Sequence, residues 1–330
     1  MPGGRAEPMP RILEPTDTSI ELAAEAIRAG RPVAFPTETV YGLGALTLDP
    51  RGIGEIYRLK WRPSNNPLIA HVLDPGSARS IVETWCPRCD ELASRLWPGP
   101  LTIVTARRPA VPAEAVGGLG TIAVRSPSHP VARRLLQELG GAAVSAPSAN
   151  RSGHVSPTLA RHVAEDFASE DELMILDGGR SEFGLESTVI DLSGARPVLL
   201  RPGTVTLESL RAILGEVDAP SIDEQSASPG TAARHYAPRT PAVLAPTGAV
   251  RSALAAEPLP CAVLCFDGGT VPGPHTAIAM PRDPGLYAGA LYDALRSADA
   301  LGCGRIVIEA PPSADGLWRA VCDRLRRATA

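Results

Sequence analysis

The sequence predicts an α/β protein of two domains: a larger domain on a twisted, mixed sheet and a small domain with a Rossmann-like parallel sheet. Three observations predict this fold class. The chain has 330 residues, about twice the length of a typical domain. Many short apolar runs with fewer helical segments between them fill the first two thirds, which is typical of a mixed sheet. Over residues 242–330, strands and helices instead alternate, as in a parallel sheet.

Helices of the larger domain are predicted where apolar residues recur at helical spacing between capping and breaking residues. The first is entered through Asp17 and Thr18, runs over Ile20–Ala29 and stops at Gly30. Strands are predicted where short apolar runs are bounded by turn residues. The other predicted helices of this domain are Gly52–Lys60, Pro130–Leu139 and Leu159–Ala168. The predicted strands are Pro32–Phe35, Leu68–Val72, Leu101–Thr105, Thr121–Val124, Ala142–Ser145, Leu173–Leu176, Thr188–Leu192 and Val198–Leu200.

The pattern breaks over residues 217–241, which are polar and rich in Ser, Pro and Ala. Long ordered segments of this kind tend to be functional. We therefore predict a larger, catalytic domain over 12–216, a linker over 217–241 that acts as a lid on the site, and a small α/β domain over 242–330. The strands expected in the small domain are Ala242–Leu244, Ala262–Phe266, Ala277–Met280 and Arg305–Glu309. Its helices are expected at Val250–Ala256, Gly285–Leu301 and Gly316–Arg327.

Charge and hydrophobicity exclude several classes of protein. The 36 acidic and 32 basic residues give a net charge of −4, which does not suit a protein that coats nucleic acid by bulk electrostatics. No apolar run approaches the ~18 residues that a membrane span needs. The first residues lack the apolar core of a secretion signal. A soluble, cytoplasmic protein without membrane contact is expected.

Six cysteines are too few for a disulfide scaffold. Cys86-Pro-Arg-Cys89 has the spacing of a zinc or redox pair, but no second pair of ligands accompanies it. The other cysteines lie in apolar contexts and resemble small core residues. We interpret the cysteines as structural and expect no metal site built by the protein.

Lysine and asparagine are almost absent. Lys60 is the only lysine, so 31 of the 32 basic residues are arginine, and asparagine occurs only at Asn65, Asn66 and Asn150. Such a bias replaces surface lysine by arginine, so the positions that keep Lys or Asn are candidates for chemistry that Arg or Asp does not supply. Three of these four residues fall within Lys60–Asn66.

Common nucleotide-binding loops are excluded by motif. A Walker A loop needs a lysine in a context that Leu-Lys-Trp-Arg does not provide, and Gly42-Leu43-Gly44 lacks the third glycine of a dinucleotide fingerprint. Polar motifs instead follow apolar strands. The segment Pro36–Gly44 is either a helix cap or a loop that faces a ligand crevice. Lys60 and Arg62 either complement a helix dipole or converge on the phosphates of one ligand.

Further strand ends carry polar residues with the same two interpretations. Arg125 ends an apolar strand, where its charge needs either a ligand carboxylate or a structural acid. His71 is either a satisfied core histidine or a ligand contact. Ser145–Gly153 either surrounds phosphates with backbone and hydroxyl donors or is a turn without a ligand. His235 and Tyr236 have no local core to join, so they are expected to close over a ligand.

Taken together, these motifs closely resemble the YrdC-type threonylcarbamoyl-AMP synthases in their two-domain form. The resemblance runs from about Ile12 to Arg327 and rests on PTETVYGLG, K-x-R-P-x-x-N-P-L, S-A-P-S-A-N-x-S-G, E-S-T-V and L-R-P-G, in that order. The linker sequence R-H-Y-A-P also matches the longer members. The chain departs from the family at Trp61, where glycine is common. We expect the tryptophan to narrow one wall of the site and to leave both cations in place.

The resemblance implies a reaction. L-Threonine, bicarbonate or CO2 and ATP would give L-threonylcarbamoyladenylate and pyrophosphate, with Mg²⁺ on the triphosphate. The product would pass to a tRNA threonylcarbamoyl transferase complex that modifies an adenosine of certain tRNAs. This nucleotidyl transfer needs charge neutralisation and alignment more than a strong base. A pocket of cations, hydroxyls and amides suits that demand.

The resemblance also implies the roles of individual residues. Lys60 and Arg62 would be the catalytic cations that face the phosphates. The residues assigned to threonine are Thr39, His71, Arg125, Ser145 and Ser187, with Arg125 as partner of the carboxylate. The residues assigned to ATP are Arg62, Asn66, Thr121, Pro147, Ser148, Asn150, Val155, Arg201 and Tyr236. Tyr236 would reach back from the linker to cover the nucleotide.

Three alternatives stay open. An RNA-binding or ribosome-assembly module would use a concave basic surface, against which the net charge of −4 argues without excluding a local patch or weak RNA binding. The carbamoyl-AMP-forming domain of hydrogenase maturation resembles the same core, but this chain lacks the cysteine pairs and length of those proteins. The small domain has no catalytic constellation of its own, which is compatible with a structural role.

Overall fold

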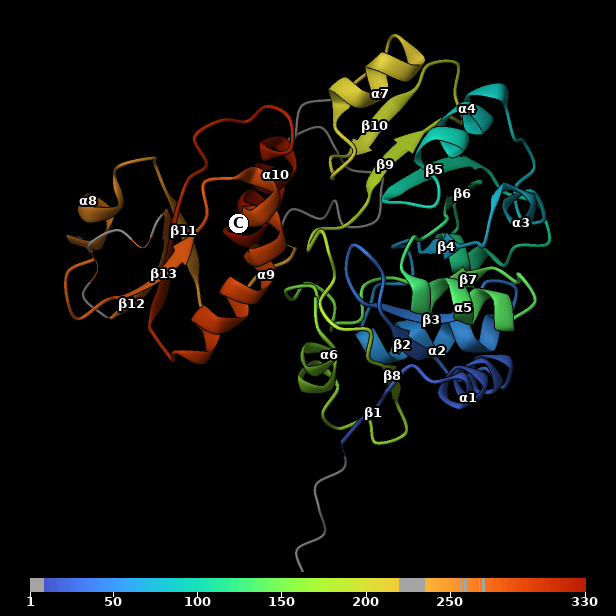
Figure 1. Cartoon of the computed structure of the whole chain (residues 1–330), viewed down its shortest axis with the longest axis horizontal. Helices are drawn as coiled ribbons and strands as arrows, with labels where there is room; N and C mark the ends of the chain where they lie inside the picture. The colour runs from blue at the N-terminus through green and yellow to red at the C-terminus, as the bar shows by residue number, and fades with distance from the viewer. Residues whose placement is uncertain (1–8, 220–234, 256, 258–259, 267, 269–270) are drawn as a thin grey trace, which may run out of the picture.

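A computed structural model describes residues 9–219, 235–255, 257, 260–266, 268 and 271–330. Figure 1 shows a larger domain with strands β1 to β10 beside a smaller one with β11 to β14. The larger sheet is mixed and the smaller is parallel, which confirms the predicted fold class. Most of the predicted linker lies outside the described residues, and its described part includes Tyr236.

The bounds of the elements follow the apolar segments of the sequence. In the larger domain the strands are β1 (Arg11–Leu13), β2 (Val33–Phe35), β3 (Gly42–Leu46), β4 (Ile69–His71), β5 (Leu101–Ala106), β6 (Thr121–Arg125), β7 (Val144–Ser145), β8 (Met174–Leu176), β9 (Thr188–Asp191) and β10 (Val198–Arg201). Its α-helices are α1 (Asp17–Arg28), α2 (Pro50–Lys60), α3 (Pro75–Arg79), α4 (Pro87–Leu96), α5 (Pro130–Glu138), α6 (Ala160–Asp166) and α7 (Leu207–Leu214). The 3₁₀ helix η1 spans Ala113–Val116.

The small domain has strands β11 (Ala242–Ala245), β12 (Cys261–Phe266), β13 (Thr276–Met280) and β14 (Arg305–Glu309), and helices α8 (Val250–Ala255), α9 (Pro284–Ala300) and α10 (Trp318–Ala328). These strands pair in the order β11-β14-β12-β13, all parallel. Figure 1 shows α9 and α10 on the face of this sheet that looks toward the larger domain, and α8 on the other side. The helices α9 and α10 therefore form the boundary between the domains.

The order of the larger sheet places polar residues on neighbouring strands. Its strands pair as β1-β8-β2-β3-β7-β4-β6-β5-β9-β10. The parallel pair β4 and β6 sets His71 opposite Arg125, each at the carboxyl end of its strand. The antiparallel strand β7 lies on the other side of β4 and ends at Ser145. Because β7 runs antiparallel to β4, the segment after Ser145 passes the amino end of β4, beside Ile69, while His71 and Arg125 lie at the other end.

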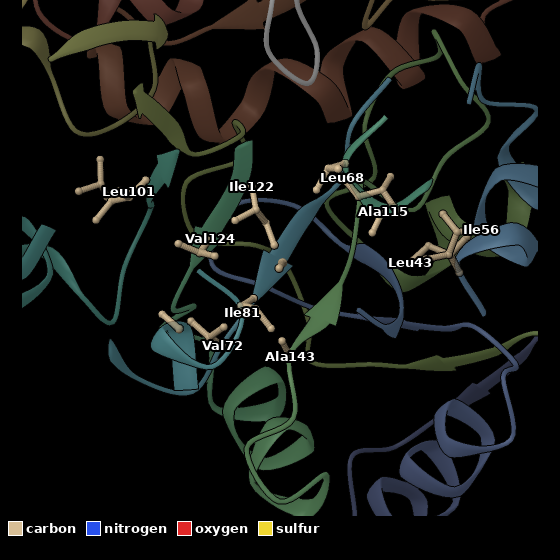
Figure 2. Close-up of a cluster of buried hydrophobic side chains, with 14 of the residues drawn as sticks. Leu43, Ile56, Leu68, Val72, Ile81, Leu101, Ala115, Ile122, Val124 and Ala143 are labelled. Carbon is tan, nitrogen blue, oxygen red and sulfur yellow. The ribbon is translucent and has the colours of Figure 1, made fainter. Parts of the chain in front are cut away.

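The core is divided by the larger sheet. Helix α1 begins at the cap Thr16, whose side chain accepts a hydrogen bond from the Ser19 backbone, and it packs against α5 over one face. The other face carries the largest buried cluster, part of which is shown in Figure 2, where Leu43, Ile56 and Val124 come from β3, α2 and β6. Apolar side chains packed on both faces make the sheet a rigid support for polar residues such as His71 and Arg125.

The structure adds elements that the sequence patterns did not predict. The segment Pro36–Gly44 was left open between a helix cap and a ligand-facing loop, and the structure shows that Gly42–Leu46 forms β3, which pairs antiparallel with β2. The sequence shows β2 as a strand because it is uniformly apolar, whereas two glycines obscure the pattern of β3. Helix α4 begins at the Cys86-x-x-Cys89 motif, and the two sulfurs lie 3.5 Å apart. Helix α7 was not predicted either.

Candidate active site

A pocket lies against one face of the larger sheet, where Ile69 and His71 of β4 and Arg125 of β6 line it. It has about 550 Å³ of empty space, a volume that includes open solvent at its mouth. Its walls come from segments far apart in the chain: the β2–β3 connection, β4, β6, the segment after β7, the segment before β9, β10 and the described end of the linker. The lining residues are Thr37, Thr39, Val40, Tyr41, Gly42, Arg62, Pro67, Ile69, His71, Arg125, Ala146, Pro147, Ser148, Glu186, Ser187, Arg201, His235 and Tyr236.

Most of the predicted site residues meet here. Of the residues assigned to threonine, Thr39, His71, Arg125 and Ser187 line the pocket. Of those assigned to ATP, Arg62, Pro147, Ser148, Arg201 and Tyr236 line it. These residues lie far apart in the sequence, and the order of the strands in the sheet brings them to one cavity. The assignments to particular substrates remain predictions.

Arg125 is held in the wall of the pocket by three contacts. Its Nη1 donates to Thr39 Oγ1 at 2.8 Å and its Nε donates to the Gly99 carbonyl at 3.3 Å. Its Nη2 lies 2.7 Å from Glu38 Oε1 in a buried ion pair. No N–H of Nη2 is aligned for a hydrogen bond to any residue that the structure describes. Arg125 therefore pairs with a structural acid, which is one of the two partners that the sequence left open. Its Nη2 still has N–H groups for a ligand.

His71 lies beside Arg125 and is neutral near pH 7. Burial, followed by the positive charge of Arg125, lowers the pKa of His71 to about 3. Its Nδ1 lies 3.2 Å from the Ile69 carbonyl, which fits a proton on that nitrogen. Nε2 of this tautomer is then an acceptor. The histidine thus offers the pocket a neutral ring next to a cation.

Two more arginines, Arg62 and Arg201, line the pocket. Arg62 Nε donates to the Asn66 carbonyl at 3.1 Å, and Nη2 donates to Asn66 Oδ1 at 2.5 Å and the Pro67 carbonyl at 2.8 Å. Burial lowers the pKa of Arg62 to about 10, so it stays charged at neutral pH. Arg201 donates from Nε to the Ser187 carbonyl at 3.0 Å and from Nη2 to Ser187 Oγ at 3.1 Å. Such buried guanidinium groups suit an anionic ligand.

Lys60 lies outside the pocket lining formed by the described residues, and its assignment to phosphates stays a prediction. Its side chain is fully buried. Its Nζ donates to the Ser148 carbonyl at 2.6 Å and to the Asn150 carbonyl. Burial, followed by the positive charge of Arg62, lowers the pKa of Lys60 well below its usual value. The lysine therefore fixes the segment that presents Ser148 to the pocket.

The remaining assigned residues also lie outside the lining formed by the described residues: they are Asn66, Thr121, Ser145, Asn150 and Val155. Asn66 orients Arg62, and Ser145 Oγ lies 3.0 Å from Thr47 Oγ1. Asn150 Nδ2 donates to the His154 carbonyl at 2.9 Å and so shapes its own loop. Thr121 begins β6, at the opposite end of that strand from Arg125. Val155 packs in the cluster that contains Tyr236.

Trp61 differs from its expectation. The side chain is 72% exposed and does not narrow the pocket. Its backbone is left-handed, with φ at +53°, a conformation that favours glycine. The guanidinium carbon of Arg151 lies 4.3 Å from the ring centroid. The residue caps α2 at the surface, which explains why glycine serves equally well at this position.

Glu186 is a pocket residue that the sequence analysis quoted within E-S-T-V but did not assign. Its carboxylate accepts from Ser156 Oγ at 2.6 Å and, across the domain boundary, from Tyr292 and from Arg324 Nε, both at 2.8 Å. Burial acts to raise the pKa of Glu186, but Arg324 and Arg201 outweigh it and the pKa is lowered. A signal was present in the sequence, because an acid two residues from a buried strand needs partners.

The described end of the linker closes the pocket. Tyr236 is buried, stacks on Tyr292 with ring centroids 5.8 Å apart, and has the guanidinium of Arg324 5.2 Å from its ring. The neighbouring His235 is buried, and its Nδ1 has no hydrogen-bond partner among the described residues. Burial lowers the pKa of His235 to about 3. This buried nitrogen beside the pocket is open to a hydrogen bond from outside the described residues.

Gly184, two residues before Glu186, lies where the two domains approach each other closely. Gly184 has φ at +65°, and a Cβ there would lie 2.7 Å from Gly289 Cα on α9. Both the backbone conformation and the space require glycine. Helix α9 can therefore approach closely enough for Tyr292 to reach Glu186.

Two family models cover the chain. The Sua5/YciO/YrdC model, described as telomere recombination, matches residues 25–203, and the C-terminal domain of threonylcarbamoyl-AMP synthase matches residues 205–330. The curated threonylcarbamoyl-AMP synthase of Pyrococcus abyssi is 41% identical over 94% of this chain and 94% of its own length. This chain belongs to the threonylcarbamoyl-AMP synthase family. It is an enzyme by that membership.

Other relatives share the family or the fold. The threonylcarbamoyl-AMP synthase of Bacillus subtilis is 36% identical over 96% of this chain and 94% of its own. The crystal structure of P. abyssi Sua5 complexed with L-threonine has a TM-score of 0.88, 36% identity and coverage of 97% of both chains. Escherichia coli YciO, at 23% identity and a TM-score of 0.51, shares the fold over 58% of this chain. The two-domain resemblance inferred from the motifs is thus confirmed.

The residues that the structure describes hold neither a metal-binding cluster nor a membrane-spanning helix. Within that part of the chain, three or more His, Cys, Asp or Glu side chains nowhere gather to hold a metal ion. The described helices include none with the length and apolar character to cross a membrane.

Proposed function

We propose that the enzyme synthesises L-threonylcarbamoyladenylate from L-threonine, bicarbonate or CO2 and ATP, with release of pyrophosphate. It would then be a nucleotidyltransferase. The observation that carries the proposal is the pocket itself, whose lining includes the three buried arginines Arg125, Arg62 and Arg201. An amino acid carboxylate suits Arg125, and the phosphates of ATP suit Arg62 and Arg201.

The chemistry matches these positions. The threonine amine forms a bond to the carbon of CO2 and loses a proton, which gives a carbamate; bicarbonate would release water in the same step. A carbamate oxygen then attacks the α-phosphorus, and the bond to pyrophosphate breaks. The residues have to align two anions and neutralise charge, which buried arginines do well where water is excluded.

We propose that threonine lies against Thr39, His71, Arg125 and Ser187. Neutral His71 would accept a hydrogen bond without adding charge, and the hydroxyls of Thr39 and Ser187 lie within the hydrogen-bond networks of Arg125 and Arg201. Tyr236 would cover the nucleotide. Since Glu186, the carboxylate in the lining, is already bonded to Ser156, Tyr292 and Arg324, Mg²⁺ would arrive on ATP as part of the substrate.

The adenylate would serve tRNA modification in the cytoplasm, where a tRNA threonylcarbamoyl transferase complex would receive it. A mixed carbamic–phosphoric anhydride is reactive toward water, so the downstream enzyme must act soon after release. The proposal therefore predicts that the product accumulates poorly unless that acceptor is present.

The decisive experiment is pyrophosphate release from the purified chain with ATP and Mg²⁺, omitting threonine and then bicarbonate. Release that needs both would support carbamate adenylation. Release without threonine would contradict it and indicate ATP hydrolysis. If ATP binds but no pyrophosphate forms under any condition, the function differs from the family's, and salt-sensitive RNA binding without ATP is the next test.

A further inference from the structure

Arg125 and Arg62 line the same pocket, but their partners differ in charge. The hydrogen bonds of Arg62 all go to uncharged oxygens of Asn66 and Pro67 among the described residues. Arg125 instead lies against the carboxylate of Glu38, at 2.7 Å. Arg62 thus brings an uncompensated positive charge to the pocket, whereas Arg125 and Glu38 together are neutral.

Glu38 is built into the wall behind Arg125. The residue is buried and does not line the pocket. Its Oε2 accepts from the Ser128 backbone at 3.2 Å, and its own carbonyl accepts from the Phe183 backbone at 2.8 Å. These bonds, from the segments after β6 and before β9, fix the carboxylate independently of any ligand. Glu38 therefore presents a constant negative charge to the guanidinium.

We propose that Glu38 is the positioning residue that makes the pocket around Arg125 accept a singly charged carboxylate and reject phosphate. Glu38 acts through Arg125 and does not touch the ligand. This inference rests on the proposed function, since it takes Arg125 to be the partner of an amino acid carboxylate. It deepens that function by assigning the pocket's choice between its two anionic substrates to one buried acid.

The physical reason is the different dependence of two energies on ligand charge. The loss of hydration that a ligand suffers in a buried site grows with the square of its charge, whereas its attraction to a fixed group grows only linearly. A neutral Arg–Glu pair with unused N–H groups can hold a single charge by hydrogen bonds. These hydrogen bonds do not offset the larger loss of hydration that a phosphate dianion suffers, and Glu38 also repels the dianion. The partners of Arg62 are neutral, so they do not repel a phosphate that binds to it.

Position matters as well as charge. Three contacts fix the guanidinium plane: Thr39 at Nη1, Gly99 at Nε and Glu38 at Nη2. Nη2 is buried without an aligned hydrogen bond among the described residues, so it still has donors for a carboxylate. If Glu38 were shortened, the plane would lose one of its three supports while the charge stayed.

The test separates these two effects in the full-length chain. Calorimetry counts the inorganic phosphates bound without ATP, and a second titration measures L-threonine affinity with and without phosphate. E38Q removes the charge and keeps the shape. E38D keeps the charge and withdraws it from Nη2. The double variant E38Q/R125Q removes the new site, and E257Q, which alters an Arg–Glu pair in the small domain, is the matched control.

E38Q is expected to bind one more phosphate than the wild type, and phosphate should compete with threonine at least tenfold more strongly. E38Q/R125Q should return to the wild-type number of phosphates. E38D should bind threonine at least tenfold more weakly without gaining a phosphate, and E257Q should match the wild type. Melting curves establish that each variant is folded, and E38D decides the question if E38Q is not.

Three results would overturn the inference. They are a folded E38Q with the wild-type number of phosphates, an extra phosphate that persists in the double variant, and an E38D that binds threonine normally. Failure of the proposed function looks different: the wild type would then release no pyrophosphate, yet E38Q would still gain a phosphate that depends on Arg125. Normal pyrophosphate release with no effect of E38Q would leave the function intact and remove the role of Glu38.

Discussion

The two sheets of this chain use the carboxyl ends of their strands in opposite ways. In the larger domain, β4 and β6 end in His71 and Arg125, which face a pocket. In the small domain, β14 ends in Glu309, whose carboxylate accepts from the Phe266 backbone at 3.0 Å and the Gly248 backbone at 3.3 Å. The amides that a ligand would use in a parallel sheet are bonded to the protein's own acid.

The difference teaches that a Rossmann-like sheet does not by itself make a binding site. The polar groups of the small domain that reach the site come from its helices: Tyr292 on α9 and Arg324 on α10 both bond to Glu186. Its sheet supports those helices from behind. The larger domain supplies the pocket, and the small domain supplies partners for one wall and for Tyr236.

The largest effect on stability is expected from Arg324→Met. The change leaves the buried carboxylate of Glu186 without its cationic partner, which costs about 3–5 kcal/mol of unfolding free energy. Urea unfolding measures it. Glu309→Gln is the control, because an amide still accepts from the two backbone groups and costs about 1 kcal/mol or less. Arg324→Met should also raise the KM for ATP through Tyr236, and equal costs for both variants would contradict the comparison.

Arg62→Ala is expected to lower the rate of pyrophosphate release by about 10²–10³-fold, the usual effect of removing one preorganised donor to a developing anion. Because Arg62 lines the pocket, water can replace its donors to the Asn66 and Pro67 oxygens, so the melting temperature should fall less than for Lys60→Met. Steady-state kinetics with ATP and threonine measure the rate. A variant that turns over at the wild-type rate would show that Arg62 does not contact the phosphates.

Lys60→Met should act on stability rather than on phosphate binding. It removes the donor to the Ser148 and Asn150 carbonyls, and unsatisfied buried carbonyls cost about 1–3 kcal/mol. Calorimetry of ATP binding beside urea unfolding separates the two properties. If ATP binding falls as far as in Arg62→Ala while stability is unchanged, the lysine faces phosphates after all.

Acid should destabilise the pocket through its buried histidines. The folded-state pKa of His71 is about 3, whereas histidine in an unfolded chain titrates near 6.5. Below pH 6.5 the histidine binds a proton in the unfolded chain, whereas His71 in the folded chain does not bind it until about pH 3. Stability is therefore full above pH 6.5 and is lost as the pH falls, by up to about 1.4 kcal/mol per unit for each such histidine. Unfolding at pH 7 and pH 5.5 should show a smaller loss for His71→Asn than for wild type.

The smallest effect is expected from Trp61→Gly. Glycine relieves the left-handed backbone, worth about 1 kcal/mol, and removes the contact with Arg151, worth about 0.5–1 kcal/mol. The unfolding free energy should change by less than about 1 kcal/mol, with unchanged KM values because Trp61 does not line the pocket. A large change in KM would place the tryptophan at the site.

The sequence predicted the fold class and most of the pocket because their signals are local. Apolar runs predict strands whatever they pair with, and a charge at the end of such a run, as at Arg125, indicates a site or an ion pair. Motif order then identified the family. Strand β3 was not predicted, because Gly42 and Gly44 weaken its pattern and only pairing with β2 makes it a strand.

Long-range partners were decided by the tertiary structure alone. Lys60 was conspicuous in the sequence, but its direction depends on where the chain around Ser148 passes, 88 residues later. Glu38 meets Arg125 across 87 positions, and Glu186 meets Arg324 across 138. Composition and periodicity tell which side chains need a partner, since burying a charge is costly. Which partner each one meets depends on the packing of the two sheets and the helices between them.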